Sequence, residues 1–442
     1  MGEKIAKKPD HDGQYYVILS IMAAMTGLSE VVSSQKRELE EQLSRPYVER
    51  AVAPESVAPT DLIRVVVGPR RAGKSTLAIQ LLKRLGGGGY VNFDDERLSD
   101  LADADLLLAA VDEVYGRPTN LLFDEIQNFP SWELLANRLQ RAGRRLLLTG
   151  SNAHLLAGEL ATHLTGRYQQ IVLLPFSFAE TLASRNEGTA GAHLSPAFER
   201  YLREGGYPEP LLRGANRGEY LRDLVRATLH KDVVRRHHIR TAAGLEDALH
   251  FLMSNDAKEF SYRTLAAIAR VTSPTTAEKH VRLLAEAFLL FTVNRFSFKA
   301  RERATANKKA YAIDPSLAVH LGTRPGLDLG RLAENVVAIA LWRQQLSGEL
   351  ELAFWKNREH EEVDFVVRRA GRISQLIQVC WDLTEPATRS RELRALVKAG
   401  EELRCTELWC LANVAEGTET FEWGHQRAAI RMMPIERWLA DR

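Results

Sequence analysis

The segment Val65-Val-Val-Gly-Pro-Arg-Arg-Ala-Gly-Lys-Ser-Thr76 decides how the rest of this 442-residue chain is interpreted. Its three valines favour a strand, and residues 77–84 have the apolar spacing of a helix. Between them stands Gly68-x-x-x-x-Gly73-Lys74-Ser75, which in a strand-loop-helix context is typical of a phosphate-binding loop. A chance match to a glycine-containing turn is the alternative, and the flanking strand and helix argue against it.

The residue types of this loop suit a nucleoside triphosphate and its magnesium ion. Gly68 and Gly73 allow backbone angles that residues with a Cβ avoid, so successive N–H groups can turn toward phosphates at a helix N-terminus. Lys74 is expected to reach the β- and γ-phosphates, and the Ser75 hydroxyl is expected to bind Mg²⁺. ATP and Mg²⁺ are therefore the expected cofactors. The residues expected to surround ATP are Gly68, Pro69, Arg70, Arg71, Ala72, Gly73, Lys74, Ser75 and Thr76.

A second stretch, residues 119–127, adds two carboxylates to the predicted site. It is an apolar strand that ends in Asp124 and Glu125, and parallel neighbouring strands present such ends at the same edge of a sheet. Asp124 is expected to hold the magnesium shell. Glu125 is expected to orient and deprotonate the attacking water, which predicts hydrolysis rather than nucleotide binding alone.

Polar residues beyond the next predicted strand, at 145–149, are further candidates. Ser151 or Asn152 is expected to sense the γ-phosphate or to hold the attacking water. Arg167 precedes the following strand, where its charge could stabilise a nucleotide bound to the next subunit. For Arg167, a plain surface arginine remains the alternative.

Composition limits the classes of protein that remain. The apolar fraction is 45% and the charged fraction 26%, as in globular proteins, and a formal net charge of +2 excludes a globally basic nucleic-acid coat. The length allows three or so domains, each with its own core. The apolar run at residues 15–27 is too short to span a bilayer, so no membrane association is expected.

Three cysteines, Cys380, Cys405 and Cys410, lack metal-ligand spacing. Together with a predicted ATP site, they favour the cytoplasm. Residues 35–50 are predicted to form a charged, solvent-facing helix, and residues 51–60 a linker.

Strands and helices alternate from residue 60 to residue 176, which predicts a doubly wound α/β sheet. Residues 90–95 are one of its strands. The strand ends in Asp94 and Asp95, which either approach the magnesium site or form an ordinary solvated turn, the latter being favoured.

Several motifs together resemble a known family. Gly-Pro-Arg-Arg-x-Gly-Lys-Ser, Phe-Asp-Glu-Ile-Gln, Thr-Gly-Ser-Asn, Leu-Thr-Gly-Arg-Tyr and Leu-Pro-Phe-Ser-Phe follow one another, and residues 205–209 and 311–315 continue the likeness. The chain resembles the archaeal-type prokaryotic AAA+ ATPases whose C-terminal part is the DUF4143 region, over residues 60 to about 440. The resemblance implies ATP hydrolysis and a role near DNA, or in defence and regulation.

The expected fold class is α/β, with a P-loop AAA+ core followed by three further parts. Residues 1–59 are an N-terminal helical extension and linker, and residues 60–176 are the ATPase core. Residues 177–244 are expected to form a helical lid, residues 245–325 a winged helix, and residues 326–442 a degenerate restriction-endonuclease-like domain.

The predicted winged helix has three helices and two strands. Its third helix would be the reading element and carries Lys279, His280 and Arg282. The hairpin between the strands is expected to contact phosphates. Its basic residues are Lys299, Arg301, Arg303, Lys308 and Lys309. A winged helix that binds proteins is the alternative.

The C-terminal part has the order of a magnesium nuclease, with Glu334 on a helix and Asp364 on a strand. The position of the second carboxylate is Gln378, and that of the lysine is Cys380. One ligand has lost its charge and the activating cation is gone, so the site is interpreted as a relic that cuts no DNA.

The leading hypothesis is an ATPase that remodels DNA or translocates on it as a ring-like homo-oligomer, such as a hexamer. Two alternatives remain. One is an ATP-gated regulatory or defence switch that acts through protein partners, and the other is an ATP-dependent nuclease. Salt-dependent DNA binding would separate the leading hypothesis from the switch.

Overall fold

The computed structural model describes residues 11–52, 58, 60–150, 166–214, 216–239, 242–323 and 326–442. The chain divides into two compact units. The first unit comprises Met1–Tyr47, Pro54–Val67 and Lys74–Ile171, and the second unit comprises Val48–Ala53, Gly68–Gly73 and Val172–Arg442.

The first unit is built on a five-stranded sheet in the order β2-β3-β4-β1-β5. The strands are β1 (Ile63–Val67), β2 (Gly89–Asn92), β3 (Asn120–Asp124), β4 (Arg145–Gly150) and β5 (Tyr168–Val172). β1 pairs in parallel with β4, β4 with β3, and β3 with β2. All residues of β1 and β3 are buried, as expected for inner strands of a parallel sheet whose two faces are covered. The predicted α/β class is confirmed.

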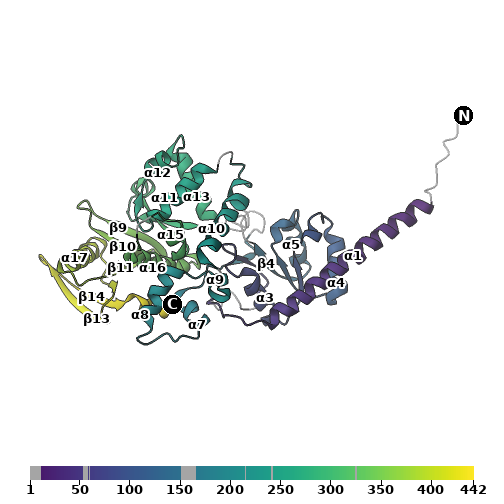
Figure 1. Cartoon of the computed structure of the whole chain (residues 1–442), viewed down its shortest axis with the longest axis horizontal. Helices are drawn as coiled ribbons and strands as arrows, with labels where there is room; N and C mark the ends of the chain where they lie inside the picture. The colour runs from purple at the N-terminus through teal and green to yellow at the C-terminus, as the bar shows by residue number, and fades with distance from the viewer. Residues whose placement is uncertain are drawn as a thin grey trace. The chain divides into compact units, whose positions relative to one another are not determined.

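Three helices connect these strands and lie beside them (Figure 1): α3 (Lys74–Arg84), α4 (Ala104–Tyr115) and α5 (Trp132–Arg141). Short turns η1 (Glu96–Leu98) and η2 (Ile126–Asn128) follow β2 and β3. The side chain of Asp103 caps α4 by accepting from the N–H of Asp105 at 2.9 Å, and Gly116 ends α4 with φ 70°.

The N-terminal helix α1 (His11–Ser44) differs from the expectation of a solvent-facing helix over residues 35–50. α1 ends at Ser44, and its face with Val32 and Leu39 is buried against α4 and β2. Gln35 is 1% exposed, because its amide donates to the carbonyl of Asn92 at 3.1 Å and accepts from the N–H of Asn92 at 3.0 Å. The charge pattern predicted the solvent-facing side of α1 but not the side that packs against α4 and β2. In Figure 1 the first turns of α1 extend past the sheet of this unit.

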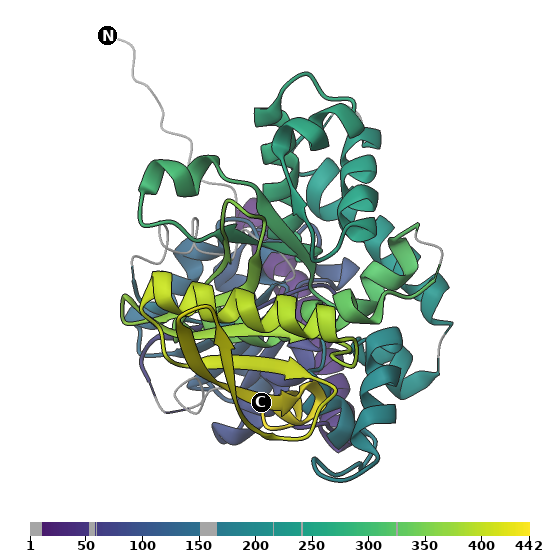
Figure 2. The same ribbon diagram turned by 90° about the vertical axis from the view of Figure 1, so that its left-hand side faces the viewer.

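The second unit contains a nine-stranded mixed sheet in the order β13-β14-β12-β11-β10-β9-β7-β8-β6. Its strands are β6 (Glu259–Phe260), β7 (Leu290–Arg295), β8 (Lys308–Ala312), β9 (Glu351–Lys356), β10 (Glu362–Arg369), β11 (Arg372–Cys380), β12 (Leu408–Ala412), β13 (Gly417–Trp423) and β14 (Gln426–Pro434). α17 (Pro386–Leu403) lies across its strands, as Figure 2 shows.

The other helices of the second unit precede the strands of this sheet, lie between them in the chain or, for the last one, follow them. They are α7 (Phe178–Ser184), α8 (Leu194–Glu204), α9 (Pro208–Arg213), α10 (Arg217–Thr228), η4 (Leu229–Val234), α11 (Ala243–Ser254), α12 (Tyr262–Ile268), α13 (Pro274–Glu286), α14 (Ala300–Thr305), α15 (Pro315–Leu321), α16 (Leu329–Leu346) and α18 (Ile435–Ala440). The described part of residues 177–256 is helical without a strand, as the periodicity predicts.

The helices α11, α12 and α13 and then the strands β7 and β8 follow in the order expected for residues 245–325, with one strand that was not expected, β6, between α11 and α12. β7 also pairs in parallel with β9, joining Asn294 to Ala353 and Arg295 to Phe354. The regions expected as winged helix and C-terminal domain therefore share one sheet. The expected hairpin loop contains α14, and Lys308 and Lys309 lie within β8 rather than in the loop.

Two motifs of the family resemblance meet in the second unit. The N–H of Gly206 donates to Asp314 Oδ2 at 2.7 Å, and a Cβ on Gly205 would lie 1.9 Å from Asp314 Oδ1. Glycine at 205 is therefore required by the close approach of a buried carboxylate, as well as by its φ of 67°.

Candidate functional site

The predicted phosphate loop connects β1 directly to α3. Gly68 has φ 150° and Gly73 has φ 94°, which are conformations that favour glycine. A Cβ on Gly68 would also lie 2.0 Å from the carbonyl oxygen of Leu173. Both glycines of the motif are thus demanded by the backbone, as the sequence predicts.

In the first unit, the start of α3 meets the carboxyl ends of β3 and β4. Ser75 Oγ donates to Asp124 Oδ1 at 2.9 Å, and the Thr149 hydroxyl donates to the same oxygen. Lys74 is 5% exposed, and its charge offsets part of the rise that burial causes in the pKa of Asp124. The structure therefore brings together Lys74, Ser75 and Asp124, three of the residues predicted from two distant motifs.

The carboxylate of Asp124 is suited to hold a cation. It is 4% exposed, and burial raises its pKa despite the hydrogen bonds from Thr149 and Ser75. Its hydrogen-bond donors are neutral hydroxyls, which orient the carboxylate without balancing its charge. Carboxylate and hydroxyl oxygens are ligands that Mg²⁺ accepts, so Ser75 and Asp124 fit the predicted metal role.

Glu125 follows in a strained conformation. Its φ of 50° and ψ of 46° place a residue with a long side chain in the left-handed region, which costs about 1–3 kcal/mol. Its N–H donates to Thr149 Oγ1 at 3.0 Å, and its carboxylate accepts from the Gln127 side-chain amide. These contacts hold the backbone of Glu125 directly beside the Asp124 carboxylate.

Thr149 is a residue of this site that the sequence analysis did not single out. It is fully buried and joins Asp124 to Glu125 by donating to one and accepting from the other. Its position at the end of β4, next in the sheet to β3, was the available signal. The candidates Ser151 and Asn152 lie outside the described residues. Asp95 caps η1, and its hydrogen bonds with Arg97 lower its pKa to about 2, so it forms the ordinary turn that was favoured.

Arg167 is exposed and lies at the amino end of β5. Its carbonyl oxygen accepts from the N–H of Ile63 at 3.0 Å, at the start of β1. The phosphate loop follows the other end of β1, about 17 Å away for a five-residue strand. Arg167 therefore does not reach the phosphate loop of its own chain.

The variable residues of the loop are engaged by other parts of the second unit. Arg70 donates to both carboxylate oxygens of Asp232, at 2.6 and 2.8 Å, and Arg71 donates to Glu209 at 2.6 Å. The carbonyl of Ala72 accepts from the buried Arg50 at 2.9 Å. Pro69 accepts from the N–H of Ala72 at 3.4 Å, and Thr76 is exposed on α3.

The expected nucleic-acid residues divide by exposure. Lys279 and Arg282 are exposed on α13, whereas His280 is buried in the core and cannot read bases. Lys299, Arg301 and Arg303 are exposed around α14. Lys308 is half-buried and donates to Asn294 Oδ1 at 2.8 Å.

Lys309 does not belong to that surface, contrary to the sequence expectation. It is 2% exposed, and its Nζ lies 2.8 Å from Glu334 Oε1, 2.6 Å from Glu362 Oε1 and 3.0 Å from Asp364 Oδ1. Strand alternation explains the difference, because Lys308 and Lys309 point to opposite faces of β8. Burial alone would lower the pKa of Lys309, but the three carboxylates outweigh it and raise that pKa well above its ordinary value.

Glu334 on α16 and Asp364 on β10 meet as the nuclease-like order predicts, with Lys309 between them. Burial raises the pKa of Glu334 to about 8 and also raises that of Asp364. Gln378 accepts from the N–H of Asp364 at 3.3 Å and donates to Glu392 at 2.6 Å. Burial raises the pKa of Cys380 to about 11, so this thiol is neutral at pH 7.

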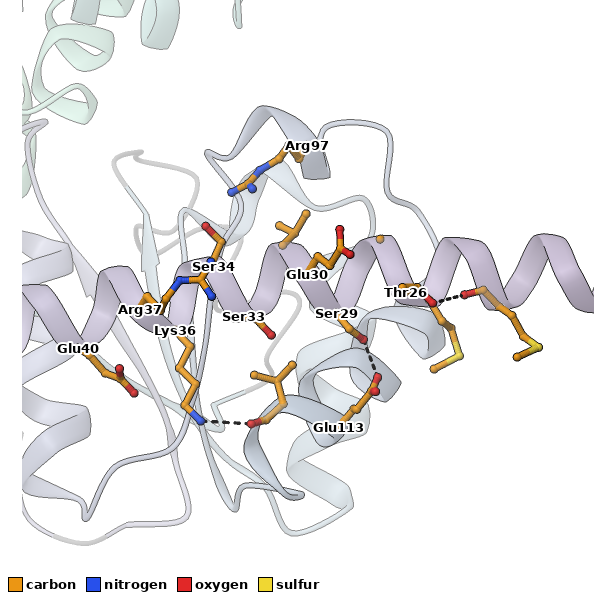
Figure 3. Close-up of a pocket in the computed structure, with 15 residues that line it drawn as sticks. Thr26, Ser29, Glu30, Ser33, Ser34, Lys36, Arg37, Glu40, Arg97 and Glu113 are labelled. Carbon is orange, nitrogen blue, oxygen red and sulfur yellow. Dashed lines mark hydrogen bonds between the residues drawn. The ribbon is translucent and has the colours of Figure 1, made fainter.

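A separate groove of the first unit runs along α1 (Figure 3). Ser29 donates to Glu113 Oε2 at 2.6 Å and Lys36 donates to the carbonyl of Val114 at 3.3 Å. These bonds tie α1 to α4. Apart from residues 22–40 of α1, the groove is lined by Arg97, Glu113 and Val114, and none of the predicted catalytic residues lines it.

Every helix in the described part of the chain is too short or too polar to span a bilayer. No three His, Cys, Asp or Glu side chains in the same part of the chain are grouped so that they could hold a metal ion as the structure stands.

Comparison with known families matches three consecutive parts of the chain. Residues 60–182 match an AAA domain, residues 195–330 match a domain of unknown function, DUF8612, and residues 329–436 match DUF4143, a second domain of unknown function. The resemblance that the motifs indicated, to an AAA ATPase with a C-terminal DUF4143 domain, is confirmed.

Similar proteins come from archaea and bacteria. An uncharacterized protein of Methanocaldococcus jannaschii is 29% identical over 85% of this chain and 88% of its own length, and one of Haemophilus influenzae is 28% identical over 74% and 84%. A Walker-type ATPase of Pyrococcus abyssi has a TM-score of 0.38 at 16% identity, covering 64% of this chain and 94% of its own. The RuvB Holliday junction branch migration motor of Thermotoga maritima has a TM-score of 0.27 at 18% identity, covering 52% and 81%.

Proposed function

We propose that this chain, in which an AAA domain precedes a DUF4143 domain, hydrolyses ATP to ADP and phosphate and uses the cycle to bind and remodel DNA. The observation that carries the ATPase proposal is the contact between Ser75, at the start of α3, and the buried carboxylate of Asp124. Two motifs 49 positions apart meet at one oxygen atom, as a phosphate loop and its acidic strand must.

Each residue of this site has a separate role. Lys74 attracts the β- and γ-phosphates, and the N–H groups of the loop bind the phosphate oxygens. Ser75 and Asp124 would hold Mg²⁺, which supplies charge stabilisation at the phosphates when bound. Glu125 accepts a proton from the attacking water. Thr149 accepts a hydrogen bond from the backbone N–H of Glu125 and so fixes the backbone from which the Glu125 side chain extends.

The DNA part of the proposal rests on exposed basic residues of the second unit. Lys279 and Arg282 share one face of α13, three positions apart, and Lys299, Arg301 and Arg303 surround α14. Phe298 is 76% exposed beside this basic group. An aromatic ring among cations suits stacking on an unpaired base together with phosphate contacts.

The proposed assembly is a homo-oligomer, for which a hexameric ring is one form. Its support is Arg167, which is exposed and lies at the end of the sheet away from its own phosphate loop. Such an arginine could complete a neighbour's site. Mixing Arg167→Ala with Lys74→Ala subunits should then restore activity that neither variant has alone, whereas mixed assemblies that form and stay inactive would refute the role of Arg167.

The function is tested by measuring ATP hydrolysis with single-stranded, duplex and branched DNA added in turn. We expect stimulation by at least one form, and binding that weakens steeply as salt rises. Lys279→Glu/Arg282→Glu should abolish the stimulation, and Arg427→Glu, an exposed basic residue on β14, is the matched control. Hydrolysis that no DNA alters, together with no salt-dependent binding, would favour a switch that acts on protein partners.

We also propose that the C-terminal part cuts no DNA, because Gln378 is neutral and Cys380 cannot replace an ammonium. Incubation with linear, supercoiled and branched DNA in excess Mg²⁺ or Mn²⁺ tests this, beside an Asp364→Ala control. Cleavage that the control lacks would establish a nuclease instead.

The need for ATP, together with three free cysteines, favours a cytoplasmic location.

A further inference from the structure

The most unusual charged group in the described part of the chain is Lys309. Its ammonium lies within 3.0 Å of oxygens from three carboxylates: Glu334, Glu362 and Asp364. The lysine comes from β8, and the carboxylates come from α16 and β10. Three elements thus converge on one buried cation.

The geometry accounts for every donor of the ammonium. A lysine has three N–H bonds, and three different carboxylates lie at 2.6, 2.8 and 3.0 Å from Nζ. The neighbouring groups complete the cage, since the Tyr311 hydroxyl donates to Glu334 Oε1 at 2.7 Å and Lys356 pairs with Glu362 at 3.2 Å. Lys309 therefore has no N–H left to position a water molecule, as an activating lysine of a nuclease would.

Three carboxylate oxygens around one point are also a set of ligands for a hard cation. Glu334 and Asp364 are the two carboxylates at which the nuclease-like order predicted a metal. We propose that the ammonium of Lys309 permanently occupies a divalent-cation site in the second unit. The chain supplies its own cation there, and the inference is independent of the proposed ATPase activity.

The distances indicate which ions would fit if Lys309 were removed. Nitrogen-to-oxygen distances of 2.6–3.0 Å leave a cage that is wide for Mg²⁺, which requires about 2.0–2.1 Å, and closer to that of Ca²⁺, at about 2.3–2.6 Å. The vacated site should therefore bind Ca²⁺ more readily than Mg²⁺. Mn²⁺ is the better probe because its binding is directly visible by electron paramagnetic resonance.

The experiment compares full-length proteins that all carry Asp124→Asn, so that the phosphate-loop site does not contribute to metal binding. Mn²⁺ is titrated without nucleotide into the parent, into Lys309→Ala, and into Lys309→Ala/Asp364→Asn. We expect one additional bound Mn²⁺ per chain in Lys309→Ala only, displaced by Ca²⁺. Lys308→Ala, the adjacent lysine on the same strand, is the matched control and should bind no additional Mn²⁺.

Loss of folding would also be informative. Removing the ammonium leaves the buried carboxylates of Glu334 and Asp364 without their cation, whereas Glu362 keeps Lys356. Lys309→Ala is therefore expected to unfold more easily, and Mn²⁺ or Ca²⁺ should restore its thermal stability. Mn²⁺ bound by the parent at Asp364 would overturn the proposal. So would a Lys309→Ala protein that neither binds Mn²⁺ nor is stabilised by it.

Discussion

Two buried carboxylate sites in this protein differ in the groups that donate hydrogen bonds to them. In the first unit, Asp124 accepts hydrogen bonds from the hydroxyls of Ser75 and Thr149. In the second unit, Asp364 accepts from the ammonium of Lys309, which also pairs with Glu334. Hydroxyls orient a carboxylate without neutralising it, whereas an ammonium does both.

This difference separates a site that is built to receive a cation from a site that is closed. A buried carboxylate with neutral donors retains its desolvation cost, which a divalent ion can relieve on binding. Where the chain places an ammonium among the carboxylates, the cost is already offset and a metal would have to displace a lysine. Two similar buried carboxylates therefore differ in metal binding: the one with neutral donors is expected to bind a divalent cation, and the one paired with an ammonium is not.

The largest expected effect concerns the open site. Lys74→Ala should abolish nucleotide binding, because it removes the charge that attracts the phosphates. Glu125→Gln should keep binding and slow turnover by about 10²–10⁴-fold, because only the general base is lost. Fluorescent-nucleotide titration and steady-state phosphate release measure the two quantities. Near-normal turnover in Glu125→Gln would refute its assignment as the base.

The second effect contrasts the two sites in stability. Lys309→Ala should lower the free energy of unfolding by about 3–5 kcal/mol, because it leaves buried carboxylates uncompensated. Asp124→Asn should cost little or even stabilise, since it removes a buried charge whose hydrogen-bond donors Ser75 and Thr149 are neutral and whose pKa burial raises despite the charge of Lys74. Urea denaturation of both variants tests this contrast. Equal changes in the free energy of unfolding for the two variants would contradict the proposed difference between a carboxylate with neutral donors and one paired with an ammonium.

A third prediction uses another closed ion pair, between Arg50 and Glu180. Burial alone would raise the pKa of Glu180, but the charges of Arg50 and Arg343 outweigh it and hold the pKa below its ordinary value of 4.5. Glu180→Gln should therefore cost about 1.5–3 kcal/mol at pH 7, because a charged hydrogen bond is lost.

The pH dependence of this cost has a defined sign. A depressed pKa stabilises the folded chain above the unfolded pKa, and this contribution is lost as pH falls through the lower folded pKa. The stabilities of the parent and Glu180→Gln should therefore converge below pH 4.5. Urea denaturation at several pH values measures this, and a difference that stays constant down to acidic pH would contradict the assignment.

The smallest expected effect is at Thr149. Thr149→Val keeps the shape and removes the hydroxyl that joins Asp124 to Glu125. We expect a loss of about 1 kcal/mol in unfolding free energy and slower ATP hydrolysis with unchanged nucleotide affinity. Thr420→Val, at an exposed position of β13, is the control and should change neither.

The features that could be predicted from the sequence are those that depend on residues close together in the chain. The glycines of the phosphate loop and the strand that ends in Asp124 were both predicted from nearby residues. Such features follow from backbone conformation and from side-chain periodicity, which neighbours in sequence set.

Contacts between side chains that are distant in the sequence could be identified from the tertiary structure alone. Thr149 became part of the site because β4 lies beside β3, and Lys309 left the expected nucleic-acid surface because β8 turns it toward α16 and β10. The partners of Lys309 lie 25 to 55 positions away along the chain. Whether a carboxylate is open to a metal depends on its donors, and packing of separate elements supplies those donors.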